Sequence, residues 1–208
     1  FIYLTSGIYV LKIDYSHIMN RLFFLQSMSL AVWALTAVII YSSASKPEIM
    51  LWYKISSFGF GLYYASILHL YLMFTRKQLA WHIIAALYIP AAIIIAATWF
   101  SYTLFEDFIF IKGQWKFIPA FRHPGFYVYL IYYITYVIIT VVMLLKWKKR
   151  AESIKEKLQS QIMANSYLLT VILCTTTDFI LPVFPSYNLP ALAPVLLVLN
   201  TAAILYAY

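Results

Sequence analysis

Charge is scarce in this sequence, and its scarcity excludes a water-soluble protein. Charged residues make up 11% of the 208 residues, whereas hydrophobic residues make up 64%. A soluble domain of this length needs more charge to cover its surface. The net charge of +8 is concentrated near the ends of apolar segments. This placement favours anchoring to anionic lipid head groups, so we expect membrane lipids and no nucleic acid as partners.

The residues needed for disulfide bonds, a retinal Schiff base, intramembrane proteolysis or metal binding are also missing. The single cysteine, Cys174, lies in an apolar run, which excludes a disulfide framework within the chain. The last apolar segment has no lysine for a retinal Schiff base, and no pair of carboxylates or His-Glu-x-x-His pattern indicates an intramembrane protease. His69 lacks a second ligand at its depth, because His82 lies among interfacial residues. We therefore expect no metal, no cofactor and no enzymatic activity.

Apolar stretches long enough to cross a bilayer can be counted directly, since a membrane helix needs about 20 residues. A first segment, Phe1 to Leu11, has about half of that length. A cleaved signal peptide is the alternative for this segment, although no small-residue cleavage site is evident. The sequence predicts an all-α, polytopic bundle of seven spans with the first truncated. The six complete or nearly complete spans are Leu22 to Ser42, Met50 to Phe74, Trp81 to Phe100, Phe126 to Leu145, Ile162 to Val183 and Leu189 to Tyr208.

A dense basic cluster fixes the predicted topology. Short loops rich in Lys and Arg stay on the cytoplasmic side, so the loop that follows Lys146 is placed inside. The connections then alternate, with the N-terminus outside and the C-terminus inside. Ten basic residues fall inside, namely Lys12, Arg21, Arg76, Lys77, Lys146, Lys148, Lys149, Arg150, Lys155 and Lys157. Five fall outside, namely Lys46, Lys54, Lys112, Lys116 and Arg122.

The outer loop from Ser101 to Gly125 contains two short runs typical of β-strands, Phe108 to Ile111 and Trp115 to Ile118. A turn that contains Gly113 joins them, so we predict a short β-hairpin within residues 105–120. The hairpin either covers the outer mouth of the bundle as a lid or rests in the head-group zone as an aromatic-rich loop. Both alternatives stay open.

Ionisable residues inside spans are costly and indicate function. Asp178 and Lys54 lie at similar depth near the outer ends of their spans, so an ion pair between them is one prediction. The alternative is that Lys54 extends to the surface and Asp178 is hydrated or bonded to neighbouring Thr hydroxyls.

These residues predict a ligand site at the outer face, under the loop from Phe105 to Arg122. An aromatic-lined, apolar cavity with few polar groups suits a small amphipathic or lipid-like ligand. The alternative is that the same residues only pack the bundle. The expected ligand-binding residues are Lys54, Asp178, Trp99, Trp115, Tyr53 and Thr177.

Several motifs follow one another along nearly the whole chain. In the first half they are the run Asn20 to Ala34, the run Lys54 to Gly59, His69 and Phe74-Thr75. In the second half they are a Tyr-rich fifth span, Trp147-Lys148-Lys149, Glu156-Lys157, Gln159-Ser160 and Thr177-Asp178 followed by Leu181-Pro182. In order and spacing they resemble the seven-transmembrane N-terminal sensor region of bacterial and archaeal histidine kinases.

This resemblance implies a multi-pass sensor in a prokaryotic cytoplasmic membrane. In that family the last helix leads to a cytoplasmic histidine kinase or diguanylate cyclase, often through a PAS domain, and any catalysis belongs to that output module. The resemblance also implies a homodimer in the parent receptor and an unassigned small-molecule ligand. Because the chain opens on Phe1 and ends flush with its last span, we expect residues 1–208 to be one sensor domain of a longer protein.

Two other functions are alternatives to a signal-sensing domain. A small membrane transporter or channel is the first, although only five glycines and no internal repeat are present. A structural subunit of a membrane complex is the second.

Overall fold

The computed structural model of the chain describes residues 1–75, 79–101, 103–111, 114–181 and 192–207. Several predicted features lie outside the described residues. They are the inner residues Arg76 and Lys77, the hairpin turn Lys112-Gly113, the segment Pro182 to Ala191 with its turn Pro185 to Asn188, and Tyr208.

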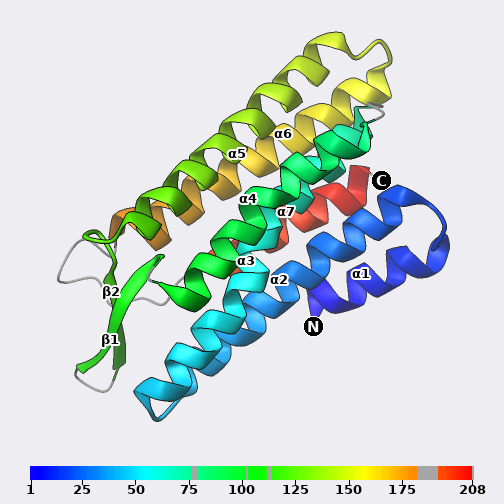
Figure 1. The fold of residues 1–208 in the computed structure, drawn as a ribbon. Coiled ribbons are helices and arrows are strands. Elements are labelled where there is room, and N and C mark those ends of the chain that lie inside the picture. Colours follow the sequence, from blue (N-terminus) through cyan, green and yellow to red (C-terminus); the bar gives the residue numbers. More distant parts are fainter. Residues whose placement is uncertain (76–78, 102, 112–113, 182–191, 208) are drawn as a thin grey trace.

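Within the described residues, the chain folds into seven α-helices and one small sheet (Figure 1). Two short apolar helices are α1 (Ile2–Ile13) and α7 (Ala193–Ala207). Five others are long and apolar enough to cross a membrane, namely α2 (Ile18–Ser42), α3 (Lys46–Phe74), α4 (Trp81–Phe100), α5 (Pro124–Arg150) and α6 (Ile154–Thr175) with its π-helical continuation Thr176–Ile180. The predicted all-α membrane bundle is confirmed.

The described part of the last span is α7, and the predicted bounds of this span, Leu189 and Tyr208, lie outside the described residues. α7 begins at Ala193, since Leu192 is not helical and Pro194 lies in the first turn. Proline is favoured at this place, where its missing N–H would have no partner within the helix anyway. The 15 residues of α7 span about 22 Å, less than the hydrocarbon core of about 30 Å. The described part of the last span is therefore shorter than a full membrane crossing.

α3 is the central helix of the bundle and packs against α2, α4 and α5. In its most apolar stretch 72% of the residues are buried, compared with 17% in the peripheral helix α4. The absence of a side chain at Gly59 lets α2 approach closely, since a Cβ atom there would lie 2.7 Å from the backbone nitrogen of Trp33. α3 therefore contributes to any space enclosed by the bundle, whereas α4 mainly faces outward.

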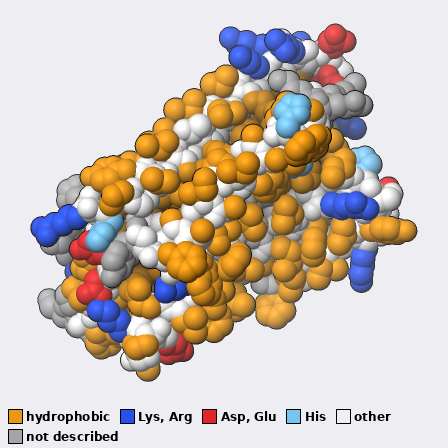
Figure 2. Space-filling model, in the orientation of Figure 1, with side chains coloured by type: hydrophobic (Ala, Val, Ile, Leu, Met, Phe, Trp, Pro, Cys, Tyr) orange, Lys and Arg blue, Asp and Glu red, His pale blue; other side chains and the backbone are white. Residues whose placement is uncertain are grey.

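The two ends of the bundle differ in charge and structure. The end formed by the α5–α6 connection carries the basic residues Lys146, Lys148, Lys149 and Arg150, and we name it the basic end. The opposite end carries the sheet, and we name it the hairpin end (Figure 1). Figure 2 shows that hydrophobic side chains cover most of the visible surface between the two ends. This apolar belt is what a bundle inside a bilayer requires.

The predicted β-hairpin is confirmed. β1 (Phe105–Ile111) pairs with β2 (Gln114–Pro119) in antiparallel register, with Phe108 opposite Phe117 and a bulge near Phe105. Phe108 is 1% exposed whereas its chain neighbour Ile109 is 37% exposed, because successive side chains of a strand point to opposite faces. The buried aromatic face fixes the hairpin against the helices.

The basic end turns sharply between two helices. α5 ends at Arg150 with basic residues in its last turn, where they complement the negative end of the helix dipole. α6 then starts at the N-cap Ser153, whose hydroxyl accepts a hydrogen bond of 3.1 Å from the backbone N–H of Glu156. Both helices therefore extend into this basic segment, and only a short connection separates them.

Candidate functional site

A cavity of about 290 Å³ lies beneath the hairpin, inside the bundle. It is bounded by α2, α3, α5, the π-helical end of α6 and the start of α7, with the hairpin residues Phe105 and Phe117 on one side. Most of its wall is aromatic or aliphatic, which is typical of pockets for apolar or amphipathic molecules. The wall also includes Trp33, Tyr53, Ser56, Phe60, Tyr64, Phe126, Tyr129, Tyr133, Cys174, Asp178 and Phe179.

Two polar contacts tie the hairpin to the connection between α2 and α3. The indole Nε1 of Trp115 donates a hydrogen bond of 2.8 Å to the backbone oxygen of Ser43, between α2 and α3. Lys46, at the start of α3, forms an ion pair with Asp107 of β1 and holds the pKa of the Asp107 carboxyl below its usual value. An exposed pair of this kind contributes only about 0 to 1 kcal/mol. The pair thus adds a second contact between the hairpin and the start of α3 but little stability.

Tyr53 of α3 lines the cavity with its ring and uses its hydroxyl for structure. The ring contacts Phe105 and Phe108 at centroid distances of 5.6 and 5.7 Å. The hydroxyl accepts a hydrogen bond of 3.0 Å from the backbone N–H of Leu104 and lies 2.8 Å from the Thr103 hydroxyl oxygen. Tyr53 thus connects α3 to the segment that leads into β1, and its ring remains available to a ligand.

Asp178 is the acidic residue in the cavity wall, and its carboxylate caps the start of α7. One carboxylate oxygen, Oδ1, accepts hydrogen bonds from the Thr177 hydroxyl at 2.7 Å and from the backbone N–H of Leu192 at 2.9 Å. The other, Oδ2, accepts one from the backbone N–H of Ala193 at 3.2 Å. The N-terminal end of a helix carries partial positive charge, which stabilises a carboxylate in this position. Ala193 lines the cavity too.

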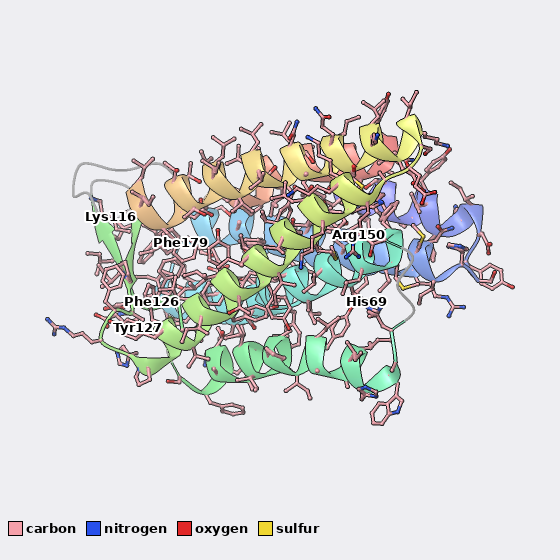
Figure 3. The ribbon with its side chains drawn as sticks, turned by 90° about the horizontal axis from the view of Figure 1, so that it is seen from above. His69, Lys116, Phe126, Tyr127, Arg150 and Phe179 are labelled. Atoms are coloured by element: carbon pink, nitrogen blue, oxygen red, sulfur yellow. The ribbon has the colours of Figure 1, made fainter. Side chains whose placement is uncertain are left out.

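The π-helix over Thr176–Ile180 positions Asp178 and Phe179. π-helical turns are rare and occur frequently at functional sites, because the extra residue turns side chains in a new direction. The ring of Phe179 stacks on Tyr133 of α5, with centroids 5.3 Å apart and planes 13° from parallel. Figure 3 shows Phe179 and Phe126 at the hairpin end, on α6 and α5. The end of α6 therefore supplies the cavity with both its carboxylate and an aromatic wall.

The structure brings some of the predicted site residues together and separates others. Tyr53 and Asp178 line the cavity, and Thr177 donates to Asp178. Trp115 lies on β2 and holds the hairpin, outside the cavity wall. Trp99 lies on the peripheral helix α4, is 37% exposed and contacts Phe58. Lys54 is half-buried and does not line the cavity.

No ion pair joins Lys54 to Asp178 among the described residues. The carboxylate of Asp178 instead bonds to backbone N–H groups and to a neighbouring hydroxyl. Of the two arrangements that the sequence left open for Asp178, the structure has the one with a Thr partner, together with a helix cap that the sequence did not indicate.

Sequence reasoning did not select the aromatic residues that form most of the wall. Tyr129 and Tyr133 are four residues apart on α5 and so lie on one helix face, with Phe126 one turn earlier. The rings of Phe60 and Tyr129 meet edge to face at 5.6 Å. The spacing of these tyrosines in the fifth span was the signal that could have found them.

The part of the chain that the structure describes holds no group of three or more His, Cys, Asp or Glu that could bind a metal ion. His69 is buried near the basic end, where its Nδ1 lies 3.2 Å from the Tyr88 hydroxyl. This contact joins α3 to α4.

Comparison with protein families identifies what this bundle is. A family model described as the N-terminal 7TM region of histidine kinase matches residues 1–208. The chain belongs to this family. No curated protein and no solved structure gives a significant match.

Membership in the histidine kinase 7TM family places the chain in a membrane, in agreement with its long apolar helices. The matched part of such kinases is their N-terminal membrane region and not their catalytic part. The bundle therefore fits a sensing domain.

Proposed function

We propose that this domain senses a small amphipathic or lipid-like ligand in the cavity beneath the hairpin and passes the signal through α7 to a cytoplasmic output module. The observation that carries the proposal is that one residue, Asp178, belongs both to the cavity wall and to the cap of α7. A ligand that contacts this wall changes the surroundings of the start of the last helix.

The cavity wall supports the ligand class. Its rings and aliphatic side chains favour an apolar body, and Asp178 and Ser56 supply polar groups for one polar end of the ligand. A sugar would leave most of its hydroxyls without partners against such a wall, and each unpaired buried polar group is costly.

Contacts along α7 support its role in the relay. In its middle, Asn200 accepts a hydrogen bond of 2.7 Å from the Tyr71 hydroxyl of α3 and donates one of 3.3 Å to the Tyr63 hydroxyl. At its end, the Gln159 side chain of α6 donates to the backbone oxygen of Ala207 at 2.6 Å. α7 is thus held at three levels by polar contacts, which define one position of the helix. A ligand moves α7 from this position to a second one only if it binds the two arrangements with different affinities, and only by the free-energy difference between these affinities.

The proposed orientation has the hairpin end outside the cell and the basic end in the cytoplasm, as the distribution of Lys and Arg predicts. In the full-length receptor, which we propose to be a homodimer, α7 then leads directly to the output module.

Cysteine labelling tests this orientation. With Cys174 replaced by alanine, Ser45→Cys should react with an impermeant thiol reagent in intact cells, and Ser153→Cys should react only after lysis. Both positions are exposed in the structure, so reactivity reports the side of the membrane. Labelling of Ser153→Cys alone in intact cells would show the opposite orientation.

Filling the cavity tests the ligand site. Cys174 is the only cysteine of the chain and lines the cavity, so its modification by a small apolar thiol reagent reports access to that space. We expect decanol, as an amphipathic probe, to slow this modification several-fold. Ala37→Phe, which adds a ring to the cavity wall, should slow it without decanol and alter signal output in the full-length receptor.

Val38→Phe is the matched control, because Val38 follows Ala37 on α2 but is 67% exposed and points away from the cavity. It should leave both modification and output unchanged. Equal effects of the two variants, or normal output with Ala37→Phe despite a blocked cavity, would contradict the proposed site.

A further inference from the structure

A second hollow of about 650 Å³ lies at the basic end, far from the ligand cavity. It is a groove between the end of α3 and the last turns of α5, and the α5–α6 connection closes its outer end. Figure 3 shows Arg150 at this end of the bundle, opposite the hairpin. The groove shares no lining residue with the cavity beneath the hairpin.

One wall of the groove is a stripe on α5 that changes from apolar to basic. Ile138, Val142, Lys146 and Arg150 follow one another at intervals of four residues, so their side chains lie on one helix face. The stripe is about 18 Å long at the helical rise, comparable to the depth of one leaflet. In the apolar half of the stripe, Ile138 is 56% exposed and Val142 is 43% exposed. An occupant of this wall must be apolar at one end and anionic at the other.

The opposite wall comes from the end of α3. Leu72, Phe74 and Thr75 line it, and the ring of Phe74 lies 6.3 Å from that of Trp147 on α5. These rings close the floor of the groove at the level of the basic residues. The groove is therefore closed by packed rings near its polar end and open along its apolar side. An acyl chain that lies in the surrounding lipid could enter along this open side.

Two carboxylates line the outer end of the groove. Glu152 lies in the connection beyond the end of α5, and Glu156 lies in the first turn of α6. From the apolar side outward, the groove thus presents aliphatic side chains, then Lys146 and Arg150, then Glu152 and Glu156. A molecule that matches this order carries a chain, then a negative group, then a positive group.

We propose that this groove binds a zwitterionic phospholipid with a primary ammonium head group, phosphatidylethanolamine. Its acyl chain lies along Ile138 and Val142, its phosphate lies between Lys146 and Arg150, and its ammonium group points toward Glu152 and Glu156. Basic pockets at the ends of membrane helices bind phosphate-containing head groups, and the outer carboxylates add the selection for an amine. A purely anionic lipid lacks a group for these carboxylates.

Lipid binding by the purified, delipidated chain tests the proposal. Native mass spectrometry with phosphatidylethanolamine, phosphatidylcholine and phosphatidylglycerol of matched acyl chains should show several-fold stronger retention of phosphatidylethanolamine. Phosphatidylcholine has a quaternary ammonium group without N–H donors, so it isolates the contribution of hydrogen bonding by the amine. Soluble phosphoethanolamine at equal concentration should not compete, because it lacks the acyl chain.

Charge variants assign the two halves of the head group. Lys146→Gln with Arg150→Gln should weaken binding of all three phospholipids. Glu152→Gln with Glu156→Gln should remove only the preference for phosphatidylethanolamine, and both substitutions leave the Ser153 cap of α6 in place. Lys148→Gln is the matched control, since Lys148 is exposed on the same turn but does not line the groove.

Three results would each overturn the proposal. Equal retention of phosphatidylcholine and phosphatidylethanolamine would show that the carboxylates do not select an amine. Equal weakening by Lys148→Gln would show general attraction of charged lipid to the basic end. Competition by soluble phosphoethanolamine would show a site for a soluble anion. None of these results affects the ligand cavity, because the two sites share no lining residue.

Discussion

Alanine at Gly59 should lower the free energy of unfolding of the bundle by about 1 to 3 kcal/mol, the cost of overpacking a tight contact. Its Cβ atom would lie 2.7 Å from both the backbone nitrogen and Cβ of Trp33, and 2.8 Å from the backbone oxygen of Ser29. Two of these three atoms belong to the backbone of α2, which cannot turn away as a side chain can. α2 and α3 must therefore separate.

Gly61→Ala is the matched control two residues further along α3. Its Cβ atom would lie 2.9 Å from Cγ1 of Ile95, and the next nearest atoms are 3.5 and 3.6 Å away. Because the close atom belongs to a side chain that can change rotamer, the loss should be clearly smaller. Thermal unfolding of both variants in the same detergent measures the difference. A loss for Gly61→Ala as large as that for Gly59→Ala would show that backbone contact does not decide the cost.

The Gly59 contact also couples stability to the ligand cavity. Trp33 lines the cavity, so a displaced α2 changes the cavity wall. We therefore expect Gly59→Ala to alter the rate at which Cys174 is modified, whereas Gly61→Ala leaves that rate near the wild-type value.

The spans could be predicted because hydropathy over about 20 residues reports burial in lipid independently of tertiary contacts. The hairpin was predictable for a related reason, since two short apolar runs flank a turn with Gly113. The start of α7 at Ala193 could not be read from hydropathy, because hydropathy does not identify a proline in the first turn, such as Pro194, as a mark of a helix start. Local helix chemistry, and not hydrophobicity, sets that boundary.

The candidate site was predictable in part. Asp178 could be selected from the sequence because a carboxylate inside a span is costly and therefore unusual. The structure places it in the cavity wall. Its partners could not be foreseen, because backbone N–H groups leave no trace in the sequence. Trp99 fails to reach the cavity because matching depth along the membrane normal does not tell which way a helix face points. The tyrosines of α5 are neutral, so the cost of burying charge in a span does not single them out as Asp178 is singled out.

Alanine at Asp178 should produce the other large loss of stability, about 2 kcal/mol or more. Loss of a helix N-cap costs about 0.5 to 2 kcal/mol, and hydrogen bonds to a charged acceptor contribute about 1.5 to 3 kcal/mol. The start of α7 depends on this carboxylate, because Pro194 has no N–H and Asp178 accepts from both Leu192 and Ala193. Without it, the first turn of α7 should fray.

Milder substitutions at Asp178 and Thr177 should lower the stability by smaller amounts. Asp178→Asn keeps one carbonyl oxygen as an acceptor, so its free energy of unfolding should lie between those of the wild type and Asp178→Ala. Thr177→Val removes one donor to Asp178 and leaves both backbone hydrogen bonds in place, so it should cost least. Lys54→Met combined with Asp178→Asn should give additive losses, since no ion pair joins the two residues.

Hydrogen exchange separates a cap from general packing. In Asp178→Ala the amides of Val195 and Leu196, which bond to the Leu192 oxygen, should exchange faster, whereas amides near Ala207 should change little. If Asp178 relays the signal as well, the basal output of the full-length receptor should shift in Asp178→Ala and less in Asp178→Asn. Uniformly faster exchange along α7 would show that Asp178 stabilises the bundle without fixing the start of this helix. An unchanged output in a variant with a frayed α7 would exclude α7 as the path of the signal.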